Sequence, residues 1–354
     1  MVAHGHNSNF RDRLQQEWQH ANGWQWWLLP LSWLYRMIVI LRRLAYRAGW
    51  LASDRLAVPV VVIGNLTVGG TGKTPLTIWL ARQLSRRGIR AGILLRGHGG
   101  RHTAPQAVLP DSDPTMTGDE AILLARQTGV PVWCGRDRAA TGRAMLASHA
   151  DLQLILCDDG LQHLSLARDM EIVVIDGERG FGNGRLLPAG PLREPATRLA
   201  NVDAIVINQP LHTPSAPTLM PDFPAMIPGV STPPTWRMTL VPGQFHNLAH
   251  PDMLVNSDHF RGQPLHAVAG IGHPDRFFRQ LAAHGLNVER HPFPDHHPYQ
   301  ANELDFAGNI IMTEKDAVKC MHFATKHMWA WPVDAEVDER LVETLLTKTG
   351  VRHG

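Results

Sequence analysis

The chain has 354 residues, of which 44% are hydrophobic and 19% are charged, and its formal net charge is +2. This length predicts about two domains, and the composition predicts folded domains with a sizeable core. The three cysteines, Cys134, Cys157 and Cys320, lie far apart and form no CxxC pair, which argues against a zinc ribbon or a disulfide framework and indicates a reducing compartment.

The first segment of the chain is a basic and apolar arm. Residues 1–55 contain seven arginines and three acidic residues, a surplus of four positive charges (7 − 3 = 4). Six of the eleven tryptophans lie in the first 50 residues, and tryptophan favours the membrane interface. The apolar run at residues 26–41 has only 16 residues and contains Arg36, whereas a spanning helix needs about 20 apolar residues.

A helix over residues 31–50 would gather its polar residues on one side. These are Ser32, Arg36, Arg43 and Arg47, and the remaining surface is Leu, Trp, Met, Ile and Val. A basic stripe on an apolar helix is typical of a helix lying at an anionic membrane surface, which is what we expect here. A spanning helix, or a helix packed on the protein's own core, are the alternatives.

The next segment has the pattern of a phosphate-binding loop. Residues 65–75 read NLTVGGTGKTP and connect a predicted strand at residues 58–63 to a predicted helix. Glycines let backbone N–H groups approach an anion, and the helix N-terminus adds partial positive charge. Lys73 would reach the β- and γ-phosphates of ATP, and Thr74 would place its hydroxyl on Mg²⁺. The candidate ATP-binding residues are Thr67, Gly69, Gly70, Thr71, Gly72, Lys73 and Thr74.

A partner for the magnesium ion is expected at the end of another buried strand. Residues 152–163 read LQLILCDDGLQH, so Asp158 and Asp159 follow an apolar run, where ligands bind in open parallel sheets. One carboxylate would hold Mg²⁺ and the other would pair with Lys73 or a water, and the sequence leaves open which does which. A solvated Asp-Asp-Gly turn is the alternative.

Strand-like and helix-like runs alternate along the first 210 residues. Predicted strands lie at residues 58–63, 90–95, 130–133, 153–157, 171–175 and 203–207, and predicted helices at 76–87, 119–128 and 136–148. This alternation predicts a parallel sheet covered by helices on both faces. We expect an arm over residues 1–52, a P-loop lobe over 53–208, a proline-rich linker over 209–235 and a smaller α/β lobe over 236–345, which begins with a strand at 236–241.

Several motifs in a fixed order resemble one family. VIGNLTVGGTGKTP is followed by LRGHGG, GDEA, CDDGLQH…GPLREP, GIGHPDRFF, FPDHHPY and MTEKDAVKC. From about residue 25 to about residue 345 the chain closely resembles tetraacyldisaccharide 4′-kinase, the lipid A 4′-kinase of Gram-negative bacteria. The resemblance implies transfer of the γ-phosphate of ATP to the 4′-hydroxyl of a tetraacylated glucosamine disaccharide 1-phosphate, at the cytoplasmic face of the inner membrane and without a nucleic-acid partner.

The resemblance also implies a catalytic pair. Asp119, in TGDEA, matches the family's base, although its position alone also suits a helix N-cap. His296, in FPDHHPY, would pair with Asp119 across the two lobes, with His297 as the adjacent rival. The group His291, Asp295, His296 and His297 is a metal site in an alternative interpretation, but its spacing fits no usual zinc pattern.

Further candidates for the active site are His163, Arg193, Glu194 and Arg96. His163 would orient the magnesium shell or touch the γ-phosphate. Arg193 would serve the phosphates, and Glu194 would serve a magnesium-bound water. Arg96 would contact the substrate phosphate or stabilise its own loop. Lys315 and Asp316, in TEKD, carry a short base-recognition signature of other P-loop proteins.

Two other functions fit parts of the sequence. A membrane-bound P-loop ATPase could use hydrolysis to switch a protein partner, but such proteins often carry a second lysine just before the Gly-Gly pair, where this chain has Val68. A soluble small-molecule kinase fits the phosphate-binding loop and leaves the tryptophan-rich arm without a purpose.

Overall fold

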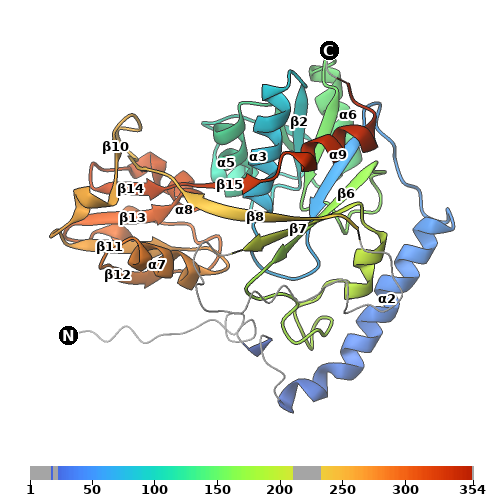
Figure 1. The fold of residues 1–354 in the computed structure, drawn as a ribbon, viewed down its shortest axis with the longest axis horizontal. Coiled ribbons are helices and arrows are strands. Elements are labelled where there is room, and N and C mark those ends of the chain that lie inside the picture. Colours follow the sequence, from blue (N-terminus) through green and yellow to red (C-terminus); the bar gives the residue numbers. More distant parts are fainter. Residues whose placement is uncertain (1–16, 19–22, 210–232, 353–354) are drawn as a thin grey trace.

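The computed structural model describes residues 17–18, 23–209 and 233–352. Two lobes lie side by side, each built on its own β-sheet, and a long N-terminal helix runs along the edge of the larger lobe (Figure 1). This arrangement confirms the predicted α/β class, with a P-loop lobe followed by a smaller one.

The larger lobe contains a nine-stranded sheet in the order β15-β8-β7-β6-β1-β5-β2-β4-β3. Only the pairs β15–β8 and β3–β4, at the two edges, are antiparallel. The strands are β1 Val60–Gly64, β2 Ala91–Leu95, β3 Gln106–Val108, β4 Val132–Cys134, β5 Leu154–Asp158, β6 Met170–Asp176, β7 Ala204–Gln209, β8 Thr235–Pro242 and β15 Val333–Val337. The central strands are continuous runs of buried Val, Ile and Leu, as expected for a parallel sheet covered on both faces.

Side-chain alternation along β1 divides the core of this lobe into two layers. The helices of this lobe are α3 Lys73–Arg86, α4 Pro114–Thr117, α5 Asp119–Thr128, α6 Arg138–Ser148, η2 Ala196–Asn201 and α9 Arg340–Thr349. Val61 and Ile63 pack in the hydrophobic cluster beneath α3, α5 and α9, whereas Val60 and Val62 pack in the cluster beneath α6 and the loops that follow β5 and β6. In the register of β1 with β5, Ile63 lies beside Asp158, so the carboxyl ends of these strands meet at one edge.

The smaller lobe contains a six-stranded sheet in the order β10-β9-β14-β13-β11-β12. Its strands are β9 Phe245–Asn247, β10 Leu254–Val255, β11 Leu265–Ala269, β12 Glu289–Pro292, β13 Asn309–Thr313 and β14 Met328–Trp331. Its helices are η3 Ser257–Phe260, α7 Pro274–Ala283, η4 Ala301–Leu304, α8 Glu314–Cys320 and η5 Met321–Phe323. Phe277, Phe278 and Leu281 of α7 pack on one face of the sheet with Trp329 and Trp331.

The two sheets divide the chain differently from the predicted boundary at residue 236. β8 pairs in parallel with β7, β15 pairs with β8, and α9 packs on β1 and β6, so all three belong with the larger lobe. The chain thus enters the smaller lobe after β8 and returns through β15 (Figure 1). Most of the predicted linker over 209–235, namely residues 210–232, lies outside the described residues, as do residues 1–16 and 19–22 of the predicted arm.

The N-terminal arm forms a short η1 helix, Gly23–Leu28, that continues into α2, Leu29–Arg47. Two residues of the predicted polar stripe face the protein: the Ser32 hydroxyl donates a hydrogen bond to the Leu186 carbonyl at 2.9 Å, and Arg43 lies 3.2 Å from Glu194. The apolar residues therefore lie on the outward side. Among the helices of the described residues, none combines the length and hydropathy that crossing a membrane requires.

Candidate active site

The phosphate cradle is the loop between β1 and α3. Gly69 and Gly72 have φ values of +95° and +94°, which side-chain-bearing residues rarely adopt. Gly72 is the N-cap of α3 and no side chain caps this helix, so the N–H groups of its first turn remain available to an anion. The close approach of Asn208 also requires glycine, because a Cβ at position 72 would lie 2.6 Å from Asn208 Nδ2.

Side chains from neighbouring strands hold the shape of the cradle. Asn65 Nδ2 donates to the Thr67 carbonyl at 2.8 Å, and Asn208 Nδ2 donates to the Thr71 carbonyl at 3.0 Å. Arg179 donates to the Gly70 carbonyl while its Nε pairs with Asp176 at 3.0 Å. The sequence interpretation did not select Asn208 or Arg179, although both lie at or just after the carboxyl end of a predicted strand.

Asp158 and Asp159 lie beside this cradle and point to different partners. Asp158 ends β5, is only 3% exposed, and accepts a hydrogen bond from the Asp159 backbone N–H at 2.9 Å. Asp159 has a φ of +47°, and its Oδ1 lies 3.5 Å from both Lys73 Nζ and an Arg193 guanidinium nitrogen. The left-handed backbone at Asp159 thus directs one carboxylate toward the cationic groups and leaves the other at the end of the sheet.

The two neighbouring carboxylates differ in acidity. Burial raises the pKa of Asp158 to about 7, with added repulsion from Glu120. Burial also opposes ionisation of Asp159, but the positive charges of Lys73, Arg193 and Arg138 outweigh it and lower the pKa of Asp159 to about 2. At neutral pH the Asp159 carboxylate is therefore ionised, whereas the Asp158 carboxylate needs a nearby cation to stay ionised.

Asp119 and His296 form a hydrogen-bonded pair between the lobes. Asp119 begins α5 and is 4% exposed, and His296 Nδ1 lies 3.0 Å and 3.1 Å from its two carboxylate oxygens. Although burial raises it, the hydrogen bond from His296 and the charges of Lys315 and Lys319 bring the pKa of Asp119 below its ordinary value. The same hydrogen bond raises the pKa of His296.

The pair lies close to the cradle. A Cβ at Gly272, in the smaller lobe, would lie 3.4 Å from the Gly70 nitrogen and 3.6 Å from Asp295, the residue before His296. The loop that carries His296 therefore approaches the glycines that would hold a triphosphate. A buried carboxylate, an imidazole that contacts it and the glycine-rich loop therefore lie near one another where the two lobes meet.

The comparisons with known proteins agree with these features. Residues 24–350 match the family described as tetraacyldisaccharide-1-P 4′-kinase. The chain belongs to this family. Proteins named tetraacyldisaccharide 4′-kinase from Methylobacillus flagellatus and Chromobacterium violaceum are 46% identical over 342 residues and 47% identical over 349 residues, covering 96% of this chain in each case and 96% and 99% of those proteins.

A solved structure of the same family has a similar fold. LpxK from Aquifex aeolicus, crystallised in complex with ATP, is 28% identical and has a TM-score of 0.73, covering 92% of this chain and 99% of that chain. The likeness therefore extends over both lobes and is not confined to the P-loop sheet.

Within this 4′-kinase family member, the two candidate histidines have separate surroundings. His297 Nε2 lies 3.0 Å from Glu303, and its ring packs against Phe293 and Tyr299. His296 alone of the two contacts Asp119, with its backbone held at a φ of +62°. The four residues of the alternative metal interpretation are not brought together, because His291 instead lies beside His266.

Lys315 joins the pair, a contact that the short TEKD signal did not predict. Its Nζ lies 3.1 Å from Glu120, 3.3 Å from Asp295 and 3.4 Å from His296 Nε2. Although burial opposes it, these carboxylates and Asp119 raise the pKa of Lys315. Asp316 is instead buried in the smaller lobe, where it accepts hydrogen bonds from the Gly270 N–H and the Tyr299 hydroxyl.

The remaining candidates are His163, Arg96, Arg193 and Glu194, and of these Arg193 contacts Asp159. Burial and nearby arginines, Arg96 among them, lower the pKa of His163 to about 4, so its imidazole is neutral at physiological pH. Arg96 follows β2 and is exposed. Glu194 is 4% exposed and pairs with Arg43 of α2 and with Arg198, at 3.2 Å and 3.5 Å, and Gln162 donates to it at 3.0 Å. Its carboxylate thus connects the N-terminal helix to the loop that carries Arg193.

Proposed function

We propose that this chain transfers the γ-phosphate of ATP to the 4′-hydroxyl of a tetraacylated glucosamine disaccharide 1-phosphate, a precursor of lipid A. The observation that carries the proposal is the pairing of Asp119 with His296 across the lobes, next to an uncapped helix N-terminus at Lys73. An ATPase that only switched a partner would need the cradle but not a buried carboxylate positioned by the second lobe.

The residues gathered where the two lobes meet each have a part in this reaction. Asp119 is ionised at neutral pH and accepts the proton of the 4′-hydroxyl as the new O–P bond forms. His296 donates a hydrogen bond that orients the carboxylate, and Lys315 adds positive charge on the other side of the imidazole. The bond between the γ-phosphorus and its bridging oxygen breaks, ADP leaves, and Lys73 with the N–H groups of α3 stabilises the charge on the phosphates.

The residues beside the cradle fit a magnesium ion. The buried Asp158 and the partly exposed Asp159 place two carboxylates side by side at the end of β5, and Asp159 Oδ1 makes no hydrogen bond within the described residues. With the Thr74 hydroxyl they form the oxygen-rich donor set that Mg²⁺ prefers. When bound there, the ion would neutralise charge on the triphosphate. The raised pKa of Asp158 favours it as a direct ligand, since a cation would relieve its repulsion from Asp159 and Glu120.

The test of the proposal is the dependence of ATP turnover on acceptor. The purified full chain is incubated with γ-labelled ATP, Mg²⁺ and the tetraacyldisaccharide 1-phosphate, with Lys73→Ala as the inactive control. We expect label to enter the lipid and ATP consumption to stop when the lipid is omitted. Consumption that continues without the lipid, or that depends on a protein partner, would favour the switch ATPase instead.

We also propose that α2 attaches the enzyme to the cytoplasmic face of the bacterial inner membrane. On its inner side, α2 contacts the larger lobe through Ser32 and Arg43, and the Tyr35 hydroxyl donates a hydrogen bond to the Arg193 carbonyl at 3.0 Å. Large apolar side chains on the arm are more than half exposed: Trp26, Trp27, Leu31, Trp33, Leu34, Met37, Ile38, Leu41, Leu44 and Trp50. An exposed apolar surface that carries tryptophans suits insertion into the interfacial layer of a membrane.

Vesicle sedimentation tests this attachment. Replacing Trp27 and Trp33, which are 87% and 64% exposed, by serine should reduce the fraction that sediments with anionic vesicles and leave folding intact. Replacing Met253 and Leu254, exposed apolar residues of the smaller lobe, by serine is the matched control. Equal binding by both variants would mean that other surfaces carry the attachment.

A further inference from the structure

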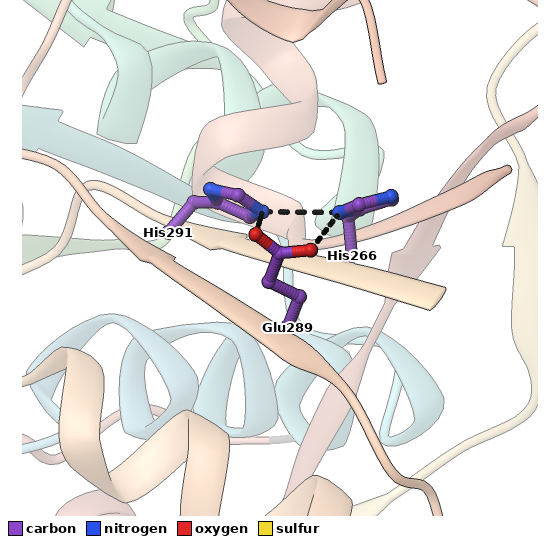
Figure 2. Close-up of side chains that lie close together, drawn as sticks. All are labelled: His266, Glu289 and His291. Atoms are coloured by element: carbon purple, nitrogen blue, oxygen red, sulfur yellow. Dashed lines mark hydrogen bonds and ion pairs between the residues drawn. The ribbon is translucent and has the colours of Figure 1, made fainter. Parts of the chain in front are cut away.

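Three metal-ligating side chains gather on the smaller lobe, apart from the residues assigned to catalysis. Figure 2 shows His266 of β11 with Glu289 and His291 of the edge strand β12. In the parallel register, His266 lies beside Glu289, and Val268 lies beside His291. Glu289 and His291 are two residues apart and therefore point to the same face of the sheet, toward His266.

The separations of the ligand atoms lie close to those around a tetrahedral ion. His266 Nδ1 lies 3.1 Å from His291 Nε2 and 3.5 Å from one Glu289 oxygen, and His291 Nε2 lies 3.9 Å from the other oxygen. Zinc–ligand bonds of about 2.0–2.2 Å in a tetrahedron place neighbouring ligand atoms about 3.3–3.6 Å apart. An ion at the centre of the three groups would need only small side-chain adjustments.

The surroundings orient the two imidazoles as ligands. His266 Nε2 lies 3.4 Å from the Ala307 carbonyl, which favours a proton on Nε2 and leaves the lone pair of Nδ1 directed at the cluster. The Phe306 ring stacks on both imidazoles, with ring centroids 4.7 Å from His266 and 4.1 Å from His291. One aromatic ring thus holds both ligands in place, while the Glu289 side chain is 68% exposed and leaves a path for entry.

We propose that His266, Glu289 and His291 bind one divalent transition metal ion of the zinc type, with water in the fourth position. Two imidazoles and a carboxylate favour Zn²⁺, Co²⁺, Ni²⁺ or Cu²⁺ over Mg²⁺, which prefers oxygen ligands. The site therefore differs in its chemistry from the magnesium position beside the phosphate cradle, and it does not depend on the proposed function.

The ion would anchor an edge strand that leads to the active site. β12 is the last strand of its sheet and pairs only with β11 within the described residues. The chain continues from β12 through Phe293, whose N–H donates to the Ala269 carbonyl at 2.8 Å, to His296. A metal bridge between β11 and β12 would hold this strand and stabilise the smaller lobe by mass action.

Zinc titration of the metal-free full chain tests the site. The chain has 20 histidines, so the wild-type protein is compared with Glu289→Gln, His291→Ala and, as a matched control, the exposed His250→Ala. A chromophoric chelator competes for Zn²⁺, Co²⁺ absorption in the visible range reports tetrahedral geometry, and the melting temperature is recorded with and without Zn²⁺. Glu289→Gln changes an exposed side chain and should fold in every case.

We expect wild type and His250→Ala each to bind one equivalent of Zn²⁺ tightly that His291→Ala does not bind. Losing a hydrogen-bond partner of a metal ligand already lowers metal affinity by about 10–100-fold. Loss of the Glu289 carboxylate, a direct ligand, should therefore weaken binding of this equivalent by on the order of 100-fold. The zinc-dependent rise in melting temperature should be lost in both cluster variants. Equal stoichiometry and affinity in all four proteins would overturn the proposal and leave a hydrogen-bonded histidine pair only.

Discussion

The phosphate cradle and the Asp119–His296 pair are assembled in different ways. The cradle lies within one lobe, where Lys73 and Asp159 follow the carboxyl ends of the adjacent strands β1 and β5. The pair joins residues 177 positions apart, one from each lobe. We therefore expect binding of the triphosphate to depend chiefly on the larger lobe, and removal of the acceptor proton to depend on both lobes. Variants in the cradle and variants in the pair separate these two steps.

The largest effect is expected from Lys73→Ala, which removes the cradle's cation. The rate of phosphoryl transfer should fall by about 10²–10³-fold or more, because removing one positioned donor to a developing charge lowers kcat by that factor. ATP affinity should fall as well, since we propose that Lys73 contacts the phosphates both before and during transfer. Steady-state kinetics and binding of a fluorescent ATP analogue measure the two quantities.

The control for this variant is Lys326→Ala, which removes an exposed lysine of the smaller lobe. It should leave both quantities unchanged. If Lys73→Ala retained wild-type turnover, the assignment of the cradle to ATP would be wrong.

A comparison of adjacent histidines should then isolate the pair. His296→Ala should lower kcat by about 10²-fold and leave ATP affinity unchanged, because we propose that the imidazole acts on the acceptor side of the reaction. His297→Ala removes a ring that pairs with Glu303 inside the smaller lobe, so it should lower the melting temperature with little effect on kcat. Similar kcat losses in the two variants would show that His296 has no special part.

The smallest expected effect is a shift in the titration of His296. Its pKa is raised mainly by the hydrogen bond to Asp119, while burial and Lys315 oppose this rise. In Asp119→Asn the opposing effects remain, so the pKa should fall below the ordinary value of 6.5, as measured by NMR of the imidazole. The control is His246, whose pKa is lowered by burial alone and should stay the same in this variant.

The same shift predicts the pH dependence of stability. A pKa raised by folding gives stabilisation that is fully present below the unfolded value of about 6.5 and is lost as the pH rises through the folded value. The difference in free energy of unfolding between wild type and Asp119→Asn should therefore be larger at pH 6 than at pH 9. It should shrink again in strong acid as Asp119 becomes protonated, because the pKa of Asp119 is lowered in the folded state. A difference that is constant over this range would mean that the two groups are not coupled.

The sequence predicted the parts of the structure that depend on local pattern. The helix at residues 119–128 has the predicted bounds, and the strands flanking the cradle lie within two residues of their expected positions. Glycine spacing and apolar runs carry these signals because they act over a single turn or strand. The contact between Asp119 and His296, in contrast, came from family resemblance and not from spacing.

The remaining features depend on contacts that local pattern does not specify. The residues of β8 predict a strand but do not indicate the lobe to which it belongs. The pairing of Thr235 with Ile205 assigns it to the larger sheet. The two faces of α2 were visible in the sequence, but amphipathicity does not say which face meets the protein. Burial of Glu194 beside Arg43 decides this, because a buried carboxylate requires a cationic partner.

A double-mutant cycle on Asp119 and His296 tests the central claim most directly. The kcat for transfer to the lipid acceptor is measured for wild type, Asp119→Asn, His296→Ala and the double variant, each at saturating ATP. If the histidine acts through the carboxylate, Asp119→Asn should lose about 10²–10⁴-fold, and the double variant should lose little more than Asp119→Asn alone. Losses that multiply in the double variant would contradict a catalytic pair formed between the two lobes.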